Sequence, residues 1–278
     1  MDVQQVFQAI KELPVIPRLM QELMTSFNDP NSEVEGIADK IAMDPVITAK
    51  VLRMASSAAF TRGKEITSIQ QAVIRPGFAR LRSLVVAASL SECFQIRREF
   101  NVHKYWTDTF QVATIAQCLA EQSRGVQIEP DTAFTCGLLH DIGELLIQSA
   151  LTEEAGLIEM IMDQGSSRVE AQRKVLGMDY SQLGAELARQ WNLSPVFIEA
   201  IHNQLDPLAF GEISAESVLI RVSVFVSFAW NASVPAELIA MRFPKPLAEY
   251  LGTDPKTLTP HLEVLHQQGN ALADLLTS

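Results

Sequence analysis

A histidine and an aspartate stand side by side at His140 and Asp141, directly after the largely apolar run Phe134–Leu139. Imidazole and carboxylate groups both bind divalent metals, and a bound metal can activate water for attack on a phosphate. Neighbouring side chains on one helix, however, point about 100° apart. We expect this dyad to lie inside an apolar helix, where only ligands from other helices could complete a metal site.

Other catalytic chemistry has little support in the sequence. It contains no GxSxG, Walker or GxGxxG pattern that would position a nucleophile or a phosphate. The cysteines are odd in number and form no CxxC pair, so we expect no disulfide framework and interpret them as small apolar groups. The other histidines lie in polar segments and are expected to face solvent, except one considered below. The cysteines are Cys93, Cys118 and Cys136. The histidines that are expected to face solvent are His103, His261 and His266.

The overall charge is acidic, with 22 lysines and arginines against 33 aspartates and glutamates and a net charge of −11. Such a surface repels phosphate backbones unless it carries a local basic patch. A single candidate patch is expected to be solvated or paired with acids, and we therefore expect no direct nucleic-acid binding. Its members are Arg75, Arg80, Arg82, Arg97 and Arg98.

No part of the sequence reaches the roughly 20 consecutive apolar residues that span a bilayer. The long uncharged stretch Val222–Ala236 is interrupted by serine, asparagine and proline. The segment Met1–Ile10 lacks the basic and apolar regions of a secretory signal. We therefore expect a cytoplasmic protein that does not contact the membrane.

Apolar residues recur with a period of 3.6 almost everywhere, which predicts an all-α protein of roughly a dozen helices. Val222–Phe228 alternates with serine, but its surroundings favour a buried helix over a strand. We expect Trp106 and Trp191 to be buried. The predicted apolar faces are Ile47, Val51, Met54 and Ala55; Leu81, Leu84, Val85 and Ala88; Phe134, Leu138, Ile142 and Leu145; and Leu183, Leu187 and Trp191.

Capping signals support these helices. Three pairs each combine a capping side chain with a proline that suits the first helical position, and two further pairs predict capping boxes. In particular, we expect Asp44 to cap a helix over residues 45–55. The proline pairs are Asp44-Pro45, Ser194-Pro195 and Asp254-Pro255, and the capping boxes are Ser32 with Glu35 and Ser68 with Gln71.

The polar stretch Ser91–Lys104 predicts a seam between two helical lobes, and Leu205–Gly211 predicts a second seam. We therefore expect one domain over residues 1–212, with an N-terminal lobe at about 1–95 and a second lobe at about 103–212. Residues 213–278 are expected to form a C-terminal helical extension packed on it. No internal repeat or low-complexity linker divides the chain.

The order and spacing of several segments resemble the HDOD family. The resemblance covers about seven-tenths of the chain. It implies an all-helical, HD-like bundle of two packed lobes, related to metal-dependent phosphohydrolases but often without their full ligand set. Such proteins serve as regulators or as outputs of bacterial response regulators, and they have no established general activity. The segments are Leu13–Pro17, Asn28–Phe60, Ile66–Ala87, Phe134–Ile147 and Gly177–Pro207.

The resemblance also allows the metal ligands to be tested one by one. Asp108 occupies the position where HD enzymes place an upstream histidine, and His202 remains from the further histidines of two-metal members. The distal aspartate, however, is matched by Val224, which cannot bind a metal. A residual site could combine Asp108 and His202 with the dyad, but we expect a buried, hydrogen-bonded His140 and an Asp141 that caps or pairs nearby.

The sequence therefore predicts a non-catalytic regulatory module that binds other signalling proteins, with no catalytic residue, cofactor or metal. The alternative is a metal-dependent phosphohydrolase or cyclic-dinucleotide phosphodiesterase that uses a residual site at Asp108, His140, Asp141 and His202. The chain has no βαβ pattern or acidic phosphoacceptor cluster of its own that would indicate a receiver domain. The sequence does not indicate a particular partner or an oligomeric state.

Overall fold

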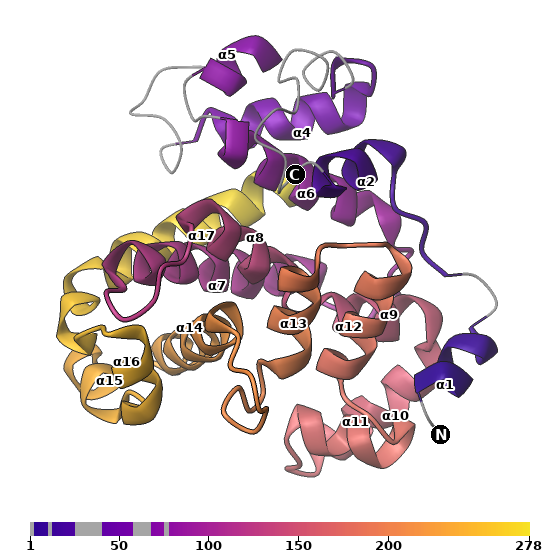
Figure 1. Ribbon diagram of the computed structural model, residues 1–278. Coiled ribbons are helices and arrows are strands. Elements are labelled where there is room, and N and C mark those ends of the chain that lie inside the picture. Colours follow the sequence, from indigo (N-terminus) through magenta and orange to yellow (C-terminus); the bar gives the residue numbers. More distant parts are fainter. Residues whose placement is uncertain (1–2, 11–12, 26–40, 58–67, 75–77) are drawn as a thin grey trace.

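The computed structural model describes residues 3–10, 13–25, 41–57, 68–74 and 78–278, and in these ranges the chain is helical without a strand (Figure 1). This agrees with the all-α prediction. The first part contains α1 (Val3–Ala9), α2 (Arg18–Thr25), α4 (Pro45–Ala55), α5 (Ile69–Ile74) and α6 (Phe78–Cys93). The second contains α7 (Val102–Gln122), α8 (Pro130–Leu139), α9 (Ile142–Ala150), α10 (Thr152–Asp163), α11 (Arg168–Leu176), α12 (Tyr180–Gln190), α13 (Pro195–Asn203) and α14 (Ala215–Asn231). The last contains α15 (Ala236–Arg242), α16 (Lys245–Leu251), the 3-10 turns η2 (Pro255–Thr257) and η3 (Thr259–His261), and α17 (Leu262–Thr277).

Of the expected capping residues in the described ranges, Asp44, Ser68 and Asp254 accept a backbone hydrogen bond with their side chains, whereas Ser194 does not. Asp44 caps α4 because its Oδ1 accepts hydrogen bonds from the backbone N–H groups of Val46 and Ile47, each at 3.0 Å. Asp254 caps η2, although this element is a 3-10 turn and not an α-helix. Ser194 stands at the start of α13, but its side chain makes no capping bond. The Ser32–Glu35 capping box lies outside the described residues.

The long helix α7 is the centre of the second lobe, with α8, α14 and α17 packed against it (Figure 1). The C-terminal helix α17 also reaches α4 of the N-terminal part. A helix from the end of the chain therefore contacts both lobes. The predicted seams fall where α6 ends before α7 and where α13 ends before α14. The proposed domain limits themselves stay a prediction.

The prediction that the dyad lies inside one apolar helix is wrong. The face Phe134, Leu138, Ile142 and Leu145 is buried as predicted, but it belongs to two helices. The first, α8, ends at Leu139, and α9 begins at Ile142, so that the dyad forms the junction. The period of the apolar residues continues across this break, which hides it in the sequence. The dyad thus lies at a corner, where the two side chains are not held by one regular helix.

A close helix crossing fixes the direction of α9 after this corner. Gly143 lies against the backbone of α12, and a Cβ atom added to Gly143 would lie only 1.9 Å from the carbonyl oxygen of Tyr180. Gly184 faces it from α12, where an added Cβ atom would lie 3.0 Å from the backbone nitrogen of Gly143. A residue with a side chain at position 143 would force the helices apart. The crossing therefore sets how α9 presents its first turn.

Two other expectations concern burial. Trp106 and Trp191 are buried, as predicted. His266 contradicts its prediction, because only 4% of its surface is exposed and its ring stacks on Trp230 with the centroids 5.2 Å apart. It lies one turn after buried Leu262 on the inner face of α17, although polar residues flank it in the sequence. Within the described residues, no helix is long and apolar enough to cross a membrane.

Candidate functional site

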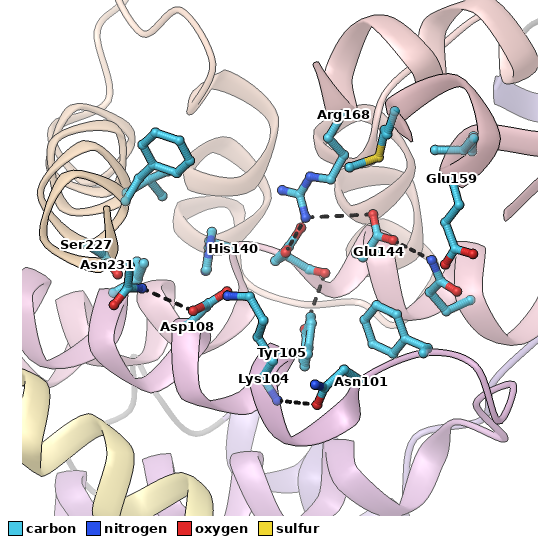
Figure 2. Close-up of a pocket in the computed structure, with 18 of the residues that line it drawn as sticks. Asn101, Lys104, Tyr105, Asp108, His140, Glu144, Glu159, Arg168, Ser227 and Asn231 are labelled. Carbon is cyan, nitrogen blue, oxygen red and sulfur yellow. Dashed lines mark hydrogen bonds and ion pairs between the residues drawn. The ribbon is translucent and has the colours of Figure 1, made fainter. Parts of the chain in front are cut away.

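The dyad lines a pocket of about 670 Å³. Its walls come from α7, α10, α11 and α14, together with the corner between α8 and α9 (Figure 2). Asp108 and Val224, the two positions matched to metal ligands on α7 and α14, line the same pocket. The fold therefore brings together most of the residues that the sequence selected. His202 is not among the residues that line it.

His140 is buried and held by its own backbone surroundings. Its Nδ1 lies 2.7 Å from the carbonyl oxygen of Gly137, one turn earlier, and its own carbonyl oxygen accepts a 2.7 Å hydrogen bond from Nε2 of Gln204. Burial lowers the pKa of His140 to about 4. The imidazole is therefore neutral near pH 7, and a neutral ring in this position donates from Nδ1 to the carbonyl oxygen.

Asp141 forms an ion pair with Arg168, the first residue of α11. Its Oδ2 accepts a hydrogen bond of 2.8 Å from Nη1 of Arg168, while its side chain makes no capping bond to α9. Burial raises the pKa of Asp141, and the charge of Arg168 opposes that rise. The expectation that Asp141 caps or pairs nearby is thus met by pairing.

Glu144 adds a second buried carboxylate, one turn after the dyad. Its Oε1 accepts a 2.8 Å hydrogen bond from Gln148, and its Oε2 accepts one of 2.7 Å from Gln172. Nη1 of Arg168 lies 3.7 Å from the same Oε2. Burial raises the pKa of Glu144, and Arg168 again opposes the rise. One guanidinium therefore serves both carboxylates (Figure 2).

The remaining candidate ligands have other partners. Oδ2 of Asp108 accepts a 2.6 Å hydrogen bond from Lys104, and its Oδ1 accepts one of 3.2 Å from Asn231. Nδ1 of His202 lies 2.7 Å from the side-chain oxygen of Asn203, and its ring packs beside Phe210. Of the four residues proposed for a residual site, His202 is thus the one that the structure places elsewhere.

These positions do not fit the metal centre that the resemblance implies. Among the residues that the structure describes, no three His, Cys, Asp or Glu side chains come together in a way that could hold a metal ion. Val224 presents an apolar side chain where a third helix would have to supply a carboxylate. One oxygen of the Asp141 carboxylate, Oδ2, already pairs with a cationic side chain. The described part of the pocket therefore does not offer the set of ligands that metal-assisted hydrolysis requires.

Two exposed apolar side chains line the pocket, and we call them its apolar rim: Phe228 on α14, which is 75% exposed, and Met162 on α10. Val112 and Val224 add less exposed apolar surface to the lining. Apolar walls with a few polar groups at fixed positions are typical of pockets that bind ligands or peptide segments.

Several of these residues escaped the sequence analysis. Arg168 and Gln172 come from α11, whose contact with the dyad depends on tertiary packing and leaves no sequence signal. Glu144 could have been found, since it lies three residues after Asp141 and therefore on a neighbouring face of a helix. Phe228 was expected to be part of a buried helix, and it is instead the exposed member of that segment.

Two members of the suspected basic patch form separate ion pairs. Arg80 lies 3.5 Å from Asp131, and Arg97 pairs with Glu159 at the edge of the pocket. Arg75 lies outside the described residues. These pairings are consistent with the expectation for the patch, while the absence of nucleic-acid binding stays a prediction.

Comparisons with known proteins agree with this architecture. The family model described as HDOD domain matches residues 13–207. A candidate phosphohydrolase of Shewanella amazonensis is 31% identical, with a TM-score of 0.84 over 98% of this chain and 97% of that one. An HDOD domain protein of Geobacter sulfurreducens is 23% identical, with a TM-score of 0.86 over 99% and 96% of the two chains.

Two longer proteins are also similar. A candidate signal transduction protein of Marinobacter aquaeolei is 19% identical, with a TM-score of 0.80 over 99% of this chain and 65% of that one. An uncharacterized protein of Treponema pallidum is 24% identical over 201 residues. That match covers 69% of this chain but only 37% of the curated relative.

Proposed function

The chain belongs to the HDOD family, and on that basis we propose that it is a non-catalytic regulatory module that binds another protein in bacterial signal transduction. The observation that carries the proposal is the exposed apolar rim of the pocket, represented by Phe228, above a dyad that lacks the ligands for metal chemistry among the described residues. A partner segment would place apolar side chains between α10 and α14.

The exposure of Phe228 supports this binding mode. Phe228 is 75% exposed and lines the pocket together with Met162, and apolar surface grouped at a pocket commonly marks an interaction site. Aromatic residues are also frequent among those that contribute most to binding energy. Met162, which lines the same pocket, adds a flexible apolar surface that adapts to different side chains.

The signalling role is supported by relatives, not by the pocket. The similar protein of Marinobacter aquaeolei is described as a candidate signal transduction protein, and this chain spans 65% of it. The matched helical unit is thus part of a longer protein there. We propose the same setting here, with the partner being another signalling protein and the location being the cytoplasm.

A phosphohydrolase or cyclic-dinucleotide phosphodiesterase is the second candidate. One detail favours it: the contact between Nδ1 of His140 and the Gly137 carbonyl leaves Nε2 as the remaining ring nitrogen, an orientation common in metal-binding histidines. The name of the Shewanella relative points to the same activity. Against it stand the ion pair of Asp141 and the apolar Val224.

Site-specific photo-crosslinking tests the proposed binding surface. The photoreactive residue p-benzoylphenylalanine replaces Phe228 in one variant and Met241 in a matched control that is 74% exposed but does not line the pocket. Both variants are produced in the cells that naturally contain the protein. We expect a crosslinked partner from position 228 alone. The partner is then purified, and its affinity is measured for Phe228→Ser and Met241→Ser.

We expect Phe228→Ser to weaken binding at least about tenfold, as for other central interface residues, while Met241→Ser leaves the affinity unchanged. Equal crosslinking at both positions, or equal affinities of the two serine variants, would contradict binding at the pocket rim. Failure to crosslink at position 228 would also count against the proposal.

A further inference from the structure

Two buried carboxylates lie one turn apart at the corner between α8 and α9. Asp141 and Glu144 are both largely shielded from water. Buried carboxylates at such a distance repel one another and are stable as anions only with a counter-charge nearby. Among the described residues, Arg168 is the cation that lies within ion-pair distance of both.

We propose that Arg168 is the resident cation of this site. It supplies, between the two carboxylates, the positive charge that a divalent ion would supply in its absence. This inference concerns the pocket floor and does not depend on the proposed partner. Nη1 of Arg168 lies 2.8 Å from Oδ2 of Asp141 and 3.7 Å from Oε2 of Glu144. This one residue thereby supplies the positive charge beside both carboxylates.

The position of the guanidinium is determined by the start of α11. Arg168 is the first residue of this helix, directly after Ser167, which forms a capping box with Glu170. The guanidinium also lies 4.1 Å from the centre of the Tyr180 ring, in a cation–π contact. The cation is therefore covalently supplied by the chain and held by contacts on two sides.

While Arg168 is in place, the geometry excludes a divalent ion from Oδ2 of Asp141. Metal–carboxylate oxygen distances are about 2.0–2.6 Å, so an ion on Oδ2 of Asp141 would overlap or strongly repel the nearby guanidinium. The other oxygen, Oδ1, is buried and has no hydrogen-bond partner among the described residues. It is an unsatisfied acceptor that one guanidinium does not reach. The cation at Oδ2 of Asp141 and beside Oε2 of Glu144 is therefore Arg168.

The two carboxylates in turn stabilise the charged form of Arg168. Burial alone would lower the pKa of Arg168, but Asp141 and Glu144 raise it above its usual value. The arginine therefore stays charged at every pH at which the protein is folded. A fixed charge that is part of the chain cannot dissociate, in contrast to a bound metal ion that a chelator removes.

Thermal unfolding with and without millimolar Mn²⁺, after removal of metals with EDTA, tests the role of Arg168. We expect the midpoint of the wild-type protein to be unaffected by Mn²⁺. Arg168→Gln should lower the midpoint by roughly 5–10 °C, as expected when one member of a buried ion pair is removed. Mn²⁺ should then raise the midpoint of this variant, because the carboxylates become free to bind it.

The double variant Arg168→Gln/Asp141→Asn separates charge compensation from packing. If Arg168 serves as the counter-ion, removing one carboxylate charge should restore at least half of the lost midpoint and abolish the response to Mn²⁺. If Arg168→Gln alone does not fold, the double variant should still fold. Arg173→Gln is the control, since it removes another arginine–carboxylate pair of α11, that with Asp179, and should give no response to Mn²⁺.

Three results would overturn the proposal. The first is stabilisation of the wild-type protein by Mn²⁺ to the same extent as Arg168→Gln, because the arginine would then not exclude the ion. The second is an unchanged midpoint for Arg168→Gln. The third is a double variant that is no more stable than the single variant, or that fails to fold.

Discussion

The indole Nε1 of Trp191 donates a 3.0 Å hydrogen bond to the carbonyl oxygen of Pro14. Trp191 lies at the end of α12, whereas Pro14 belongs to the loop between α1 and α2, so that this bond joins residues 177 positions apart. The ring also packs beside Phe94, with the centroids 6.0 Å apart. A single side chain thus connects the second lobe to the N-terminal loop and to the segment between the lobes.

Replacing Trp191 should destabilise the protein strongly. We expect Trp191→Ala to lower the free energy of unfolding by about 3–5 kcal/mol, because it removes a large buried ring. Trp191→Phe keeps much of the packing and loses the bond to Pro14, and it should cost less. Urea denaturation measures both. A loss below about 1 kcal/mol for the alanine variant would show that the ring contributes little to lobe packing.

The cap of α4 offers a smaller and more local test. Asp44→Ala removes the side chain that binds the backbone N–H groups of Val46 and Ile47, and should lower the free energy of unfolding by roughly 1 kcal/mol. Ser194→Ala is the matched control, since Ser194 also precedes a proline but makes no capping bond. Equal effects of the two substitutions in chemical denaturation would contradict the capping role.

The crossing of α9 and α12 should tolerate no side chain at Gly143. Gly143→Ala would place a Cβ atom 1.9 Å from the carbonyl oxygen of Tyr180. We expect it to lower the free energy of unfolding by roughly 3 kcal/mol or more. At Gly211 a Cβ atom would meet nothing within 4 Å, and Gly211→Ala should be nearly neutral. Similar melting midpoints for both variants would show that the helices can separate without cost.

His266 should make stability depend on pH. Burial lowers its pKa to about 4 from an ordinary 6.5, so the unfolded chain takes up a proton before the folded protein does. The stability that the neutral His266 contributes is present above pH 6.5 and is lost as the pH falls toward 4. His266→Phe keeps an aromatic ring against Trp230. Over this range of pH its free energy of unfolding should fall by roughly 1–2 kcal/mol less than that of the wild-type protein. Equal slopes for the two proteins, measured by urea denaturation, would refute this.

Most of the fold could be predicted because helix formation leaves a local pattern. The apolar face of α4, from Ile47 to Ala55, and the proline after Asp44 identify that helix without any tertiary information. The corner at His140 could not be found in this way, because Leu138 and Ile142 keep the helical period across it. His266 was misassigned by its polar neighbours, although its spacing from Leu262 places it on the buried face.

The sequence identified only part of the site: it missed Glu144 and Arg168, and it included His202, which does not line the pocket. His140, Asp141 and Asp108 do meet in one pocket, and Val224 lines it as the resemblance implied. The partner of Asp141 is Arg168, which follows it by 27 positions and reaches it through the packing of α11. No local period or motif relates these two residues, and only the assembled fold identifies their ion pair.

Turnover by the wild-type protein and by His140→Ala, assayed side by side, tests the central claim most directly. The substrates are cyclic dinucleotides and phosphate monoesters, each with excess Mn²⁺ or Fe²⁺. A non-catalytic module should give no turnover with either protein, while His140→Ala lowers the stability because it removes a buried, hydrogen-bonded ring. Reproducible turnover by the wild type that disappears in a folded His140→Ala variant would contradict the account and favour the phosphohydrolase.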